Sequence, residues 1–138
     1  MYLIISDDMR LGIIAEGKAD IAVIKAVLKA LKGIDGSDVV QLRPSEQFDE
    51  TDLNEMNFSN WNLVLKSCED NNLLHSFFDV LADDALLVVQ IDTAERGEVG
   101  YDINEPLRTK DTDWKEYCDY LYKAVEYKIS SIIPETYR

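Results

Sequence analysis

The chain has 138 residues, a length typical of one domain around a single core, so we expect residues 1–138 to form a single domain. Apolar residues make up 46% of the chain and aromatic residues 9%, a composition that excludes a disordered or fibrous protein. The net charge of −13 argues against binding of nucleic acid through a broad basic surface, because phosphate binding needs clustered lysine and arginine. A small basic groove, a metal-bridged phosphate contact and a basic protein partner remain compatible with this charge.

Two strands and a helix are predicted at the start of the chain, and a third strand follows them. Tyr2–Ile5 is a short strand candidate, and a turn leads from it into a strand over Leu11–Ala15. The helix predicted over Lys18–Lys32 has a wide apolar face and a narrow stripe of lysines. We therefore expect it to be mostly buried, with one lysine-lined edge in water. Gly33 is a good C-terminal stop for this helix, and the next strand is expected over Asp38–Leu42.

The second half of the chain continues the alternation of helices and strands. Ser45–Asn60 is acidic and contains no lysine or arginine, so it is expected to be a functional or locally mobile loop. A helix is predicted over Trp61–Leu81, with a break expected at Asp70–Asn72. Ala85–Ile91 is apolar enough for a strand covered on both faces, and the last helix is predicted over Thr112–Ile132. The buried stripe of that helix is predicted to consist of Trp114, Tyr117, Leu121, Val125, Ile129 and Ile132.

This order of elements predicts an α/β fold, with a compact, mainly parallel sheet flanked by helices. Ligands of such sheets bind at the carboxyl ends of the strands, near the point where the strand order reverses. Glu16 directly follows the strand Leu11–Ala15, and Asp92 directly follows the strand Ala85–Ile91. If these strands are neighbours, the two carboxylates face one crevice.

Carboxylates that converge at strand ends repel each other, and a bound Mg²⁺ or Mn²⁺ relieves that repulsion with the oxygen ligands it prefers. The ion can also hold a phosphate and activate a water molecule. Gly17 is expected to allow a sharp turn and the approach of a phosphate to the helix N-terminus, beside Lys18. The candidate metal ligands are Glu16, Asp20, Asp92 and Glu95.

Simpler interpretations exist for each of these residues taken alone. Asp20 can complement the helix dipole in the first turn, Glu16 can be an ordinary loop carboxylate, and Asp92 can cap a turn. Lys18 and Arg96 lie next to the two acidic clusters, within reach of a bound phosphate. The simpler expectation for both side chains is a charge solvated by water. Cys68 and Cys118 have no metal-ligand spacing and are expected to be small apolar core residues, which favours a reducing cytoplasm. The first residues lack the pattern of a signal peptide, and no apolar run approaches the roughly 20 residues of a membrane span.

A family resemblance rests on the residues around Glu16. An apolar strand, then Glu16-Gly17-x-x-Asp20, then an apolar helix resembles the first signature of the toprim domain. That domain occurs in topoisomerases, bacterial primases, recombination-mediator proteins and the overcoming-lysogenization-defect nucleases. The run IIAEGKADIAVIKAVLKAL is especially similar to the nuclease-type members. The resemblance implies a toprim-like sheet, with Glu16 as general acid/base or metal ligand.

The resemblance also implies an Asp-x-Asp pair that binds Mg²⁺ at the end of a later strand. Asp92 occupies the place of the first aspartate, but Ala94 stands at the place of the second. Glu95, one residue further on, is either a shifted ligand or the sign of a weakened site. The resemblance covers roughly residues 11 to 95.

The sequence therefore leaves three functions open. The first is Mg²⁺-dependent phosphodiester cleavage by a toprim-type nuclease of a bacterial or phage defence system, with a basic partner or an oligomer supplying the surface for nucleic acid. The second is a catalytically degenerate binding or assembly module that acts through a protein partner, with the acidic stretch 45–60 as its partner-facing element. The third is a receiver-like signalling domain, prompted by Asp7-Asp8 after YLII, although a hairpin turn explains those residues as well.

Overall fold

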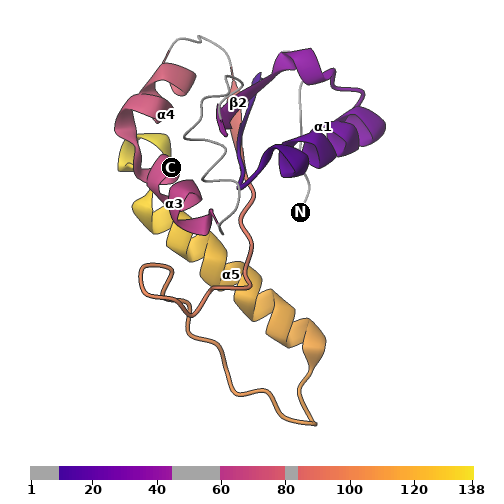
Figure 1. Ribbon diagram of the computed structural model, residues 1–138, viewed down its shortest axis with the longest axis vertical. Coiled ribbons are helices and arrows are strands. Elements are labelled where there is room, and N and C mark those ends of the chain that lie inside the picture. Colours follow the sequence, from indigo (N-terminus) through magenta and orange to yellow (C-terminus); the bar gives the residue numbers. More distant parts are fainter. Residues whose placement is uncertain (1–9, 45–59, 80–83) are drawn as a thin grey trace.

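A three-stranded parallel sheet lies at the centre of the computed structural model, with the strand order β2-β1-β3 (Figure 1). The strands are β1 (Arg10–Ile14), β2 (Val39–Arg43) and β3 (Ala85–Val89). The middle strand β1 is buried over its last four residues, as expected for a strand covered on both faces. The predicted α/β class with a parallel sheet is confirmed.

The structure describes residues 10–44, 60–79 and 84–138. The expected strand Tyr2–Ile5, the aspartates Asp7-Asp8 and nearly all of the acidic stretch 45–60 lie outside these ranges. Within them, no helix is long and apolar enough to cross a membrane.

Four α-helices surround the sheet in the described part of the chain. Asp70 separates the second from the third, because its carboxylate accepts hydrogen bonds from the backbone N–H groups of Asn72 and Leu73. The expected break in this region is confirmed. The helices are α1 (Lys18–Lys32), α3 (Trp61–Glu69), α4 (Asn71–Phe78) and α5 (Trp114–Ile132). Single turns of 3₁₀-helix occur at Gly36–Asp38 and Glu135–Tyr137.

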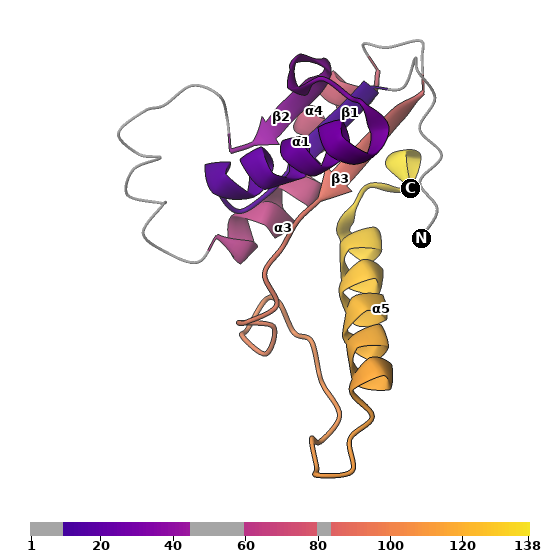
Figure 2. The same cartoon turned by 90° about the vertical axis from the view of Figure 1, so that its right-hand side faces the viewer.

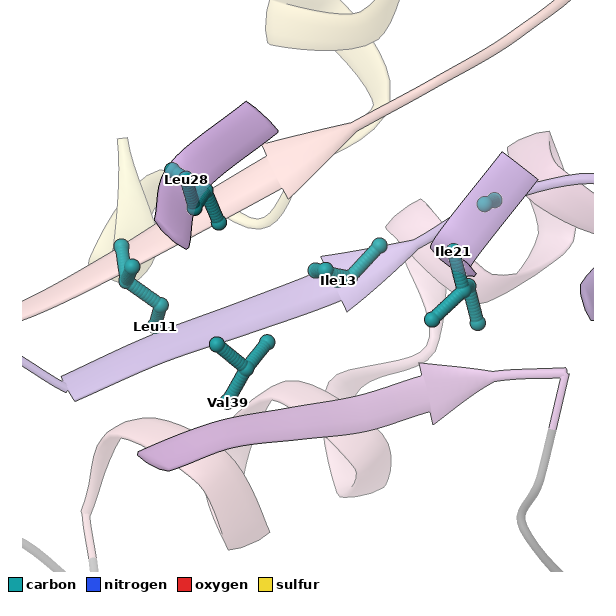
Figure 3. Close-up of a cluster of buried hydrophobic side chains, with 6 residues drawn as sticks. Leu11, Ile13, Ile21, Leu28 and Val39 are labelled. Carbon is teal, nitrogen blue, oxygen red and sulfur yellow. The ribbon is translucent and has the colours of Figure 1, made fainter. Parts of the chain in front are cut away.

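The two faces of the sheet carry separate apolar clusters, because successive side chains of a strand point to opposite faces. On one face, Leu11 and Ile13 of β1 pack with Ile21 and Leu28 of α1 and with Val39 of β2 (Figure 3). On the other face, a second cluster contains side chains of β1, α3 and α4, joined by the C-terminal part of α5. Its fully buried members are Ile14, Val64, Cys68 and Leu74. Figure 1 shows α1 on one side of the sheet and α3 and α4 on the other.

The prediction that α1 is mostly buried is wrong. Only Ile21 and Leu28 of this helix are buried, whereas Val23 is 63% exposed and Leu31 is 74% exposed. The apolar pattern extends around nearly the whole helix, but the sheet covers only one side of it. Its outward side lacks a cover in the described structure.

The helix α5 and the loop before it project beyond the end of the sheet, as Figure 2 shows. Its predicted buried stripe is only partly correct, because Tyr117 is buried whereas Trp114, at the projecting end, is 58% exposed. The expectation that both cysteines are core residues is correct only for Cys68, which is buried, whereas Cys118, on α5, is exposed.

Candidate functional site

The strand order reverses at β1, so the carboxyl ends of β1 and β3 meet at the point where the connections diverge. The chain runs from β1 to the edge strand β2, then returns past β1 to β3 on its other side. Because β1 and β3 are parallel neighbours, with Ile14 opposite Val89, the segments that follow them emerge side by side. These segments carry Glu16 and Asp92, so the expected neighbourhood of the two residues is confirmed. A reversal of this kind is where ligands of open α/β sheets bind.

The main chain at Glu16 is held by polar side chains from three directions. Its N–H donates to Gln90 Oε1 at 3.1 Å, and its carbonyl accepts from Asn60 Nδ2 at 3.2 Å. Arg43 Nη1 donates to the carbonyls of both Ala15 and Glu16, at 3.1 Å each. These contacts satisfy backbone groups beyond the strand end, where the sheet no longer can. They fix the position of Glu16 beyond the carboxyl end of β1.

The side chain of Glu16 reaches the segment after β3. Its Oε1 accepts a hydrogen bond of 2.6 Å from the backbone N–H of Asp92. Burial raises the pKa of Glu16 above its ordinary value of 4.5, and the negative charges of Asp92 and Glu95 raise it further. Hydrogen bonds from the backbone of Asp92 and Asn60 act in the opposite direction but do not cancel this rise. The charges of Asp92 and Glu95 therefore act on the Glu16 carboxyl group at this edge.

Asp92 forms a tight turn at the end of the β3 segment. Its Oδ1 accepts from the N–H of Ala94 at 2.9 Å, the local hydrogen bond of an Asx-turn. Its carbonyl accepts from the hydroxyl of Tyr101 at 3.0 Å, and the Tyr101 ring stacks on Trp61 at 5.2 Å between centroids. Burial raises the pKa of Tyr101 to about 12, so its hydroxyl stays a donor at neutral pH. Tyr101 thus anchors Asp92 to the core.

Glu95 has a buried carboxylate oxygen, Oε2, without a hydrogen-bond partner. Such an atom loses its hydration without compensation, which is costly unless another group or a cation approaches it. The next residue, Arg96, is not the solvated charge that the sequence suggests. It pairs with Glu105 at 2.6 Å and donates to the carbonyl of Thr93 at 2.7 Å. Arg96 therefore stabilises the turn that presents Glu95.

Gly17 and Asp20 form the cap of α1. The N–H of Gly17 donates to Asp20 Oδ2 at 3.1 Å, which satisfies one of the unpaired donors at the start of the helix. The φ angle of Gly17 is −146°, extended backbone that any residue adopts, so the expectation of a turn that needs glycine is wrong. Lys18 is the first residue of α1 and lies directly beside this cap. The structure brings Glu16, Asp92 and Glu95 together and gives Asp20 a separate role.

Replacing Asp20 by alanine is expected to lower the free energy of unfolding by about 0.5–1 kcal/mol, because the helix loses its cap and a favourable charge near its N-terminus. Asp20→Asn, which keeps an acceptor oxygen, should retain part of this stability. Urea unfolding of both variants measures the effect. If Asp20→Ala leaves stability unchanged and instead removes a response to divalent cations, the capping role is wrong and Asp20 is a ligand.

The donor set suits a hard divalent cation, although the carboxylates do not form a complete coordination site in this arrangement. Carboxylate oxygens are the preferred ligands of Mg²⁺ and Mn²⁺, and the unpartnered Oε2 of Glu95 is a free acceptor. In the described part of the chain, however, no three His, Cys, Asp or Glu side chains converge closely enough to hold a metal ion. Coordination by Glu16, Asp92 and Glu95 together would require these side chains to move closer.

Comparisons of the chain with protein-family models, with curated proteins and with solved structures found no match. The membership of the toprim family therefore stays a prediction based on the residues around Glu16 and Asp92.

The sequence did not point to four residues that shape the site: Arg43, Asn60, Gln90 and Tyr101. Arg43 is the last residue of β2 and Gln90 directly follows the apolar strand β3, and these positions at the strand ends were an available signal. Asn60 directly precedes α3, Tyr101 lies in a turn between β3 and α5, and nothing in their local sequence pattern indicates a contact with Glu16 or Asp92.

Proposed function

We propose that this protein is a toprim-like enzyme that cleaves phosphodiesters with the help of Mg²⁺ or Mn²⁺. The observation that supports this function best is the contact between the Glu16 carboxylate and the backbone of Asp92, at the strand ends where the strand order reverses. This contact joins the two segments that carry the toprim resemblance. It also lies where substrates of α/β sheets usually bind.

In this proposal each acidic residue has a distinct role. Asp92 and Glu95 hold the cation, and Glu16 is a further ligand or the general acid/base. The raised pKa of Glu16 brings its titration closer to neutral pH, where proton transfer by a side chain is most effective. The bound cation would supply polarisation of the phosphate and activation of a water molecule. Lys18, beside the α1 N-terminus, is the proposed phosphate contact.

The acidic chain, with a net charge of −13, cannot attract nucleic acid over a broad surface. A basic protein partner or an oligomer is therefore part of the proposal. A place in a bacterial or phage defence system follows from the family resemblance alone, whereas the cytoplasmic location follows from the two cysteines without metal-ligand spacing.

A second candidate function is a binding or assembly module with a degenerate site. Two observations favour it: Ala94 stands where the family has an aspartate, and no group of three metal-ligating side chains converges in the described ranges. In this case the carboxylates would keep only their hydrogen bonds to the backbone.

A titration with Mn²⁺ or Mg²⁺ distinguishes the two functions, because a ligand that binds only the folded state must stabilise it. At a concentration one hundred times the dissociation constant, the expected gain is about 2.7 kcal/mol. Glu95→Gln should reduce this gain, because it replaces the carboxylate whose Oε2 has no hydrogen-bond partner. Glu98→Gln is the matched control on the same turn, because Glu98 is exposed.

Activity is measured in parallel by the nicking of plasmid DNA and of RNA, with Asp92→Ala as the inactive reference. A stabilisation by cations that Glu95→Gln reduces, together with nicking that Asp92→Ala abolishes, supports the enzyme. No thermal shift at millimolar cation favours the binding module, and nicking that survives both Asp92→Ala and Glu16→Ala contradicts the assigned site.

A further inference from the structure

The free edge of β3 borders an apolar groove, which we call the β3 groove. The strand order β2-β1-β3 gives β3 a neighbouring strand on one side only. The groove has a volume of about 890 Å³ and runs between β3 and α5. All five residues of β3 are only half-buried, although their apolar run predicts a strand covered on both faces. The edge of the sheet on the α5 side therefore lacks part of its cover in the described structure (Figure 2).

The backbone of β3 directs hydrogen-bonding groups into this groove. The N–H of Gln90, directly after β3, donates to the carbonyl of Ile14 at 2.8 Å. Even-numbered residues of β3 therefore face β1, because successive residues of a strand direct their backbone groups to opposite sides. The odd-numbered residues, which include Leu87 and Val89, face the groove, and in residues 10–44, 60–79 and 84–138 no group bonds to their N–H or carbonyl. Unpaired backbone groups of this kind are a template for a further strand.

The β3 groove has apolar walls on both faces of the sheet. On one face, Val88 and Ile24 of α1 pack against the same apolar cluster, and on the other face Val89 shares a cluster with Ile129 of α5. Both Ile24 and Ile129 line the groove, and Val125 extends the α5 wall. A strand added at this edge would direct alternate side chains to the two faces. The occupant therefore needs apolar residues at successive positions, which an amphipathic helix with one apolar side does not offer.

We infer that the segment Tyr2–Ile5 binds in the β3 groove as a fourth strand, antiparallel to β3. This segment lies outside the described ranges, and its sequence YLII supplies the successive apolar residues that the two walls require. The connection from Ile5 to Arg10, the first residue of β1, passes the start of β3. Its residues 6–9 span up to about 13 Å, which covers the distance of about 10 Å from β1 to a strand beyond β3. A parallel strand would need a crossover of about a dozen residues, so the short connection allows only the antiparallel direction.

Two other occupants fit the β3 groove less well. The β3 strand of a second copy could pair with β3 across a two-fold axis, but each chain carries a net charge of −13, which opposes association. An extended segment of another protein would compete with Tyr2–Ile5, whose short tether to β1 gives it an effective concentration in roughly the millimolar range. The other edge strand of the sheet, β2, is the alternative position for Tyr2–Ile5 itself.

Nuclear magnetic resonance of the full wild-type chain tests the pairing directly. Nuclear Overhauser effects (NOEs) should join backbone protons of Tyr2–Ile5 to backbone protons of β3, because paired strands lie about 5 Å apart. Side-chain NOEs should also join alternate residues of the segment to Ile24 on one face and to Val125 on the other. This measurement needs no variant, so it does not depend on whether an altered chain folds.

Amide hydrogen exchange provides the second readout, because the two sets of β3 amides respond differently. Ile4→Pro removes a backbone donor and an apolar side chain from the proposed strand. The amides of Leu87 and Val89 should then exchange about tenfold faster or more, whereas those of Leu86 and Val88, which face β1, should change less. Ile4→Val is the matched control, because valine also favours strands, and it should exchange like the wild type. The contrast between odd and even residues separates the loss of one strand from a general loss of stability.

Four outcomes overturn the inference. The absence of NOEs between Tyr2–Ile5 and β3 in the wild type shows that the segment does not pair there, and NOEs to β2 place it at the other edge. Equally fast exchange of Leu87 and Val89 in the wild type and in Ile4→Pro leaves the edge open for a segment of another protein. Slow exchange that is lost on dilution, together with a dimer in light scattering, assigns the edge to a second copy. None of these measurements depends on the proposed nuclease activity.

Discussion

Replacing Gly12 by alanine is expected to lower the free energy of unfolding by about 1–3 kcal/mol, the usual cost of an extra carbon in a tightly packed core. A Cβ atom at this position would lie 2.7 Å from Cζ of Phe77, well inside van der Waals contact. The Phe77 ring is buried, with 3% of its surface exposed, and packs against Phe78, so it has little room to move away. The close contact of β1 with α4 therefore requires glycine.

Chemical unfolding of two further variants makes this prediction specific. Gly97→Ala is the matched control, because nothing lies within 4 Å of the added Cβ and the expected change is close to zero. The double variant Gly12→Ala with Phe77→Leu should lose less stability than the sum of the losses in the two single variants. The shorter side chain of leucine leaves space for the new methyl group. If Gly12→Ala is as stable as Gly97→Ala, the proposed contact with Phe77 is wrong.

The sheet was predictable because its strands are short apolar runs that end at polar residues, and alternation with helices implies parallel pairing. The burial of α1 was not predictable in the same way. Val23 and Leu31 have the same character as Ile21 and Leu28, and the sequence does not say which side of the helix receives a cover. The difference is set by tertiary packing: the sheet lies against one side only.

The site likewise contains one feature that the sequence pattern predicts and one that depends on contacts between distant segments. That Glu16 and Asp92 are neighbours follows from strand order, because the carboxyl ends of adjacent parallel strands meet at one edge. The unpartnered oxygen of Glu95 does not follow from it, since the course of the turn depends on the ion pair of Arg96 with Glu105. Such pairs between loops carry no periodic signal in the sequence.

The largest functional effect is expected for Glu16→Gln, which should reduce nicking about 100-fold or more if Glu16 transfers a proton. Glutamine keeps an acceptor oxygen for the backbone N–H of Asp92, so the segments that follow β1 and β3 should stay joined. A loss of activity in a folded variant then reports on the carboxylate and not on the fold. Glu98→Gln, on the exposed side of the turn, should nick as well as the wild type.

The pH dependence of stability provides a second readout of the same substitution. Burial and the charges of Asp92 and Glu95 raise the pKa of Glu16 in the folded state above its ordinary value of 4.5. The folded protein therefore holds this proton more tightly, and the resulting stability is full below pH 4.5 and is lost as pH rises through the folded pKa. The glutamine side chain of Glu16→Gln cannot ionise, so this variant should not lose stability in this way as pH rises.

The melting temperature of Glu16→Gln, measured relative to the wild type, should therefore increase as pH rises from 4 toward 7 and then level off. Glu98→Gln, a substitution of the same kind at an exposed position of the turn, is the control variant. A difference that stays constant over this range would mean that the Glu16 carboxyl is not destabilised by its neighbours. If Glu16→Gln gains relative stability as pH rises but nicks like the wild type, Glu16 is not a catalytic residue. The raised pKa of its carboxyl group would still be supported.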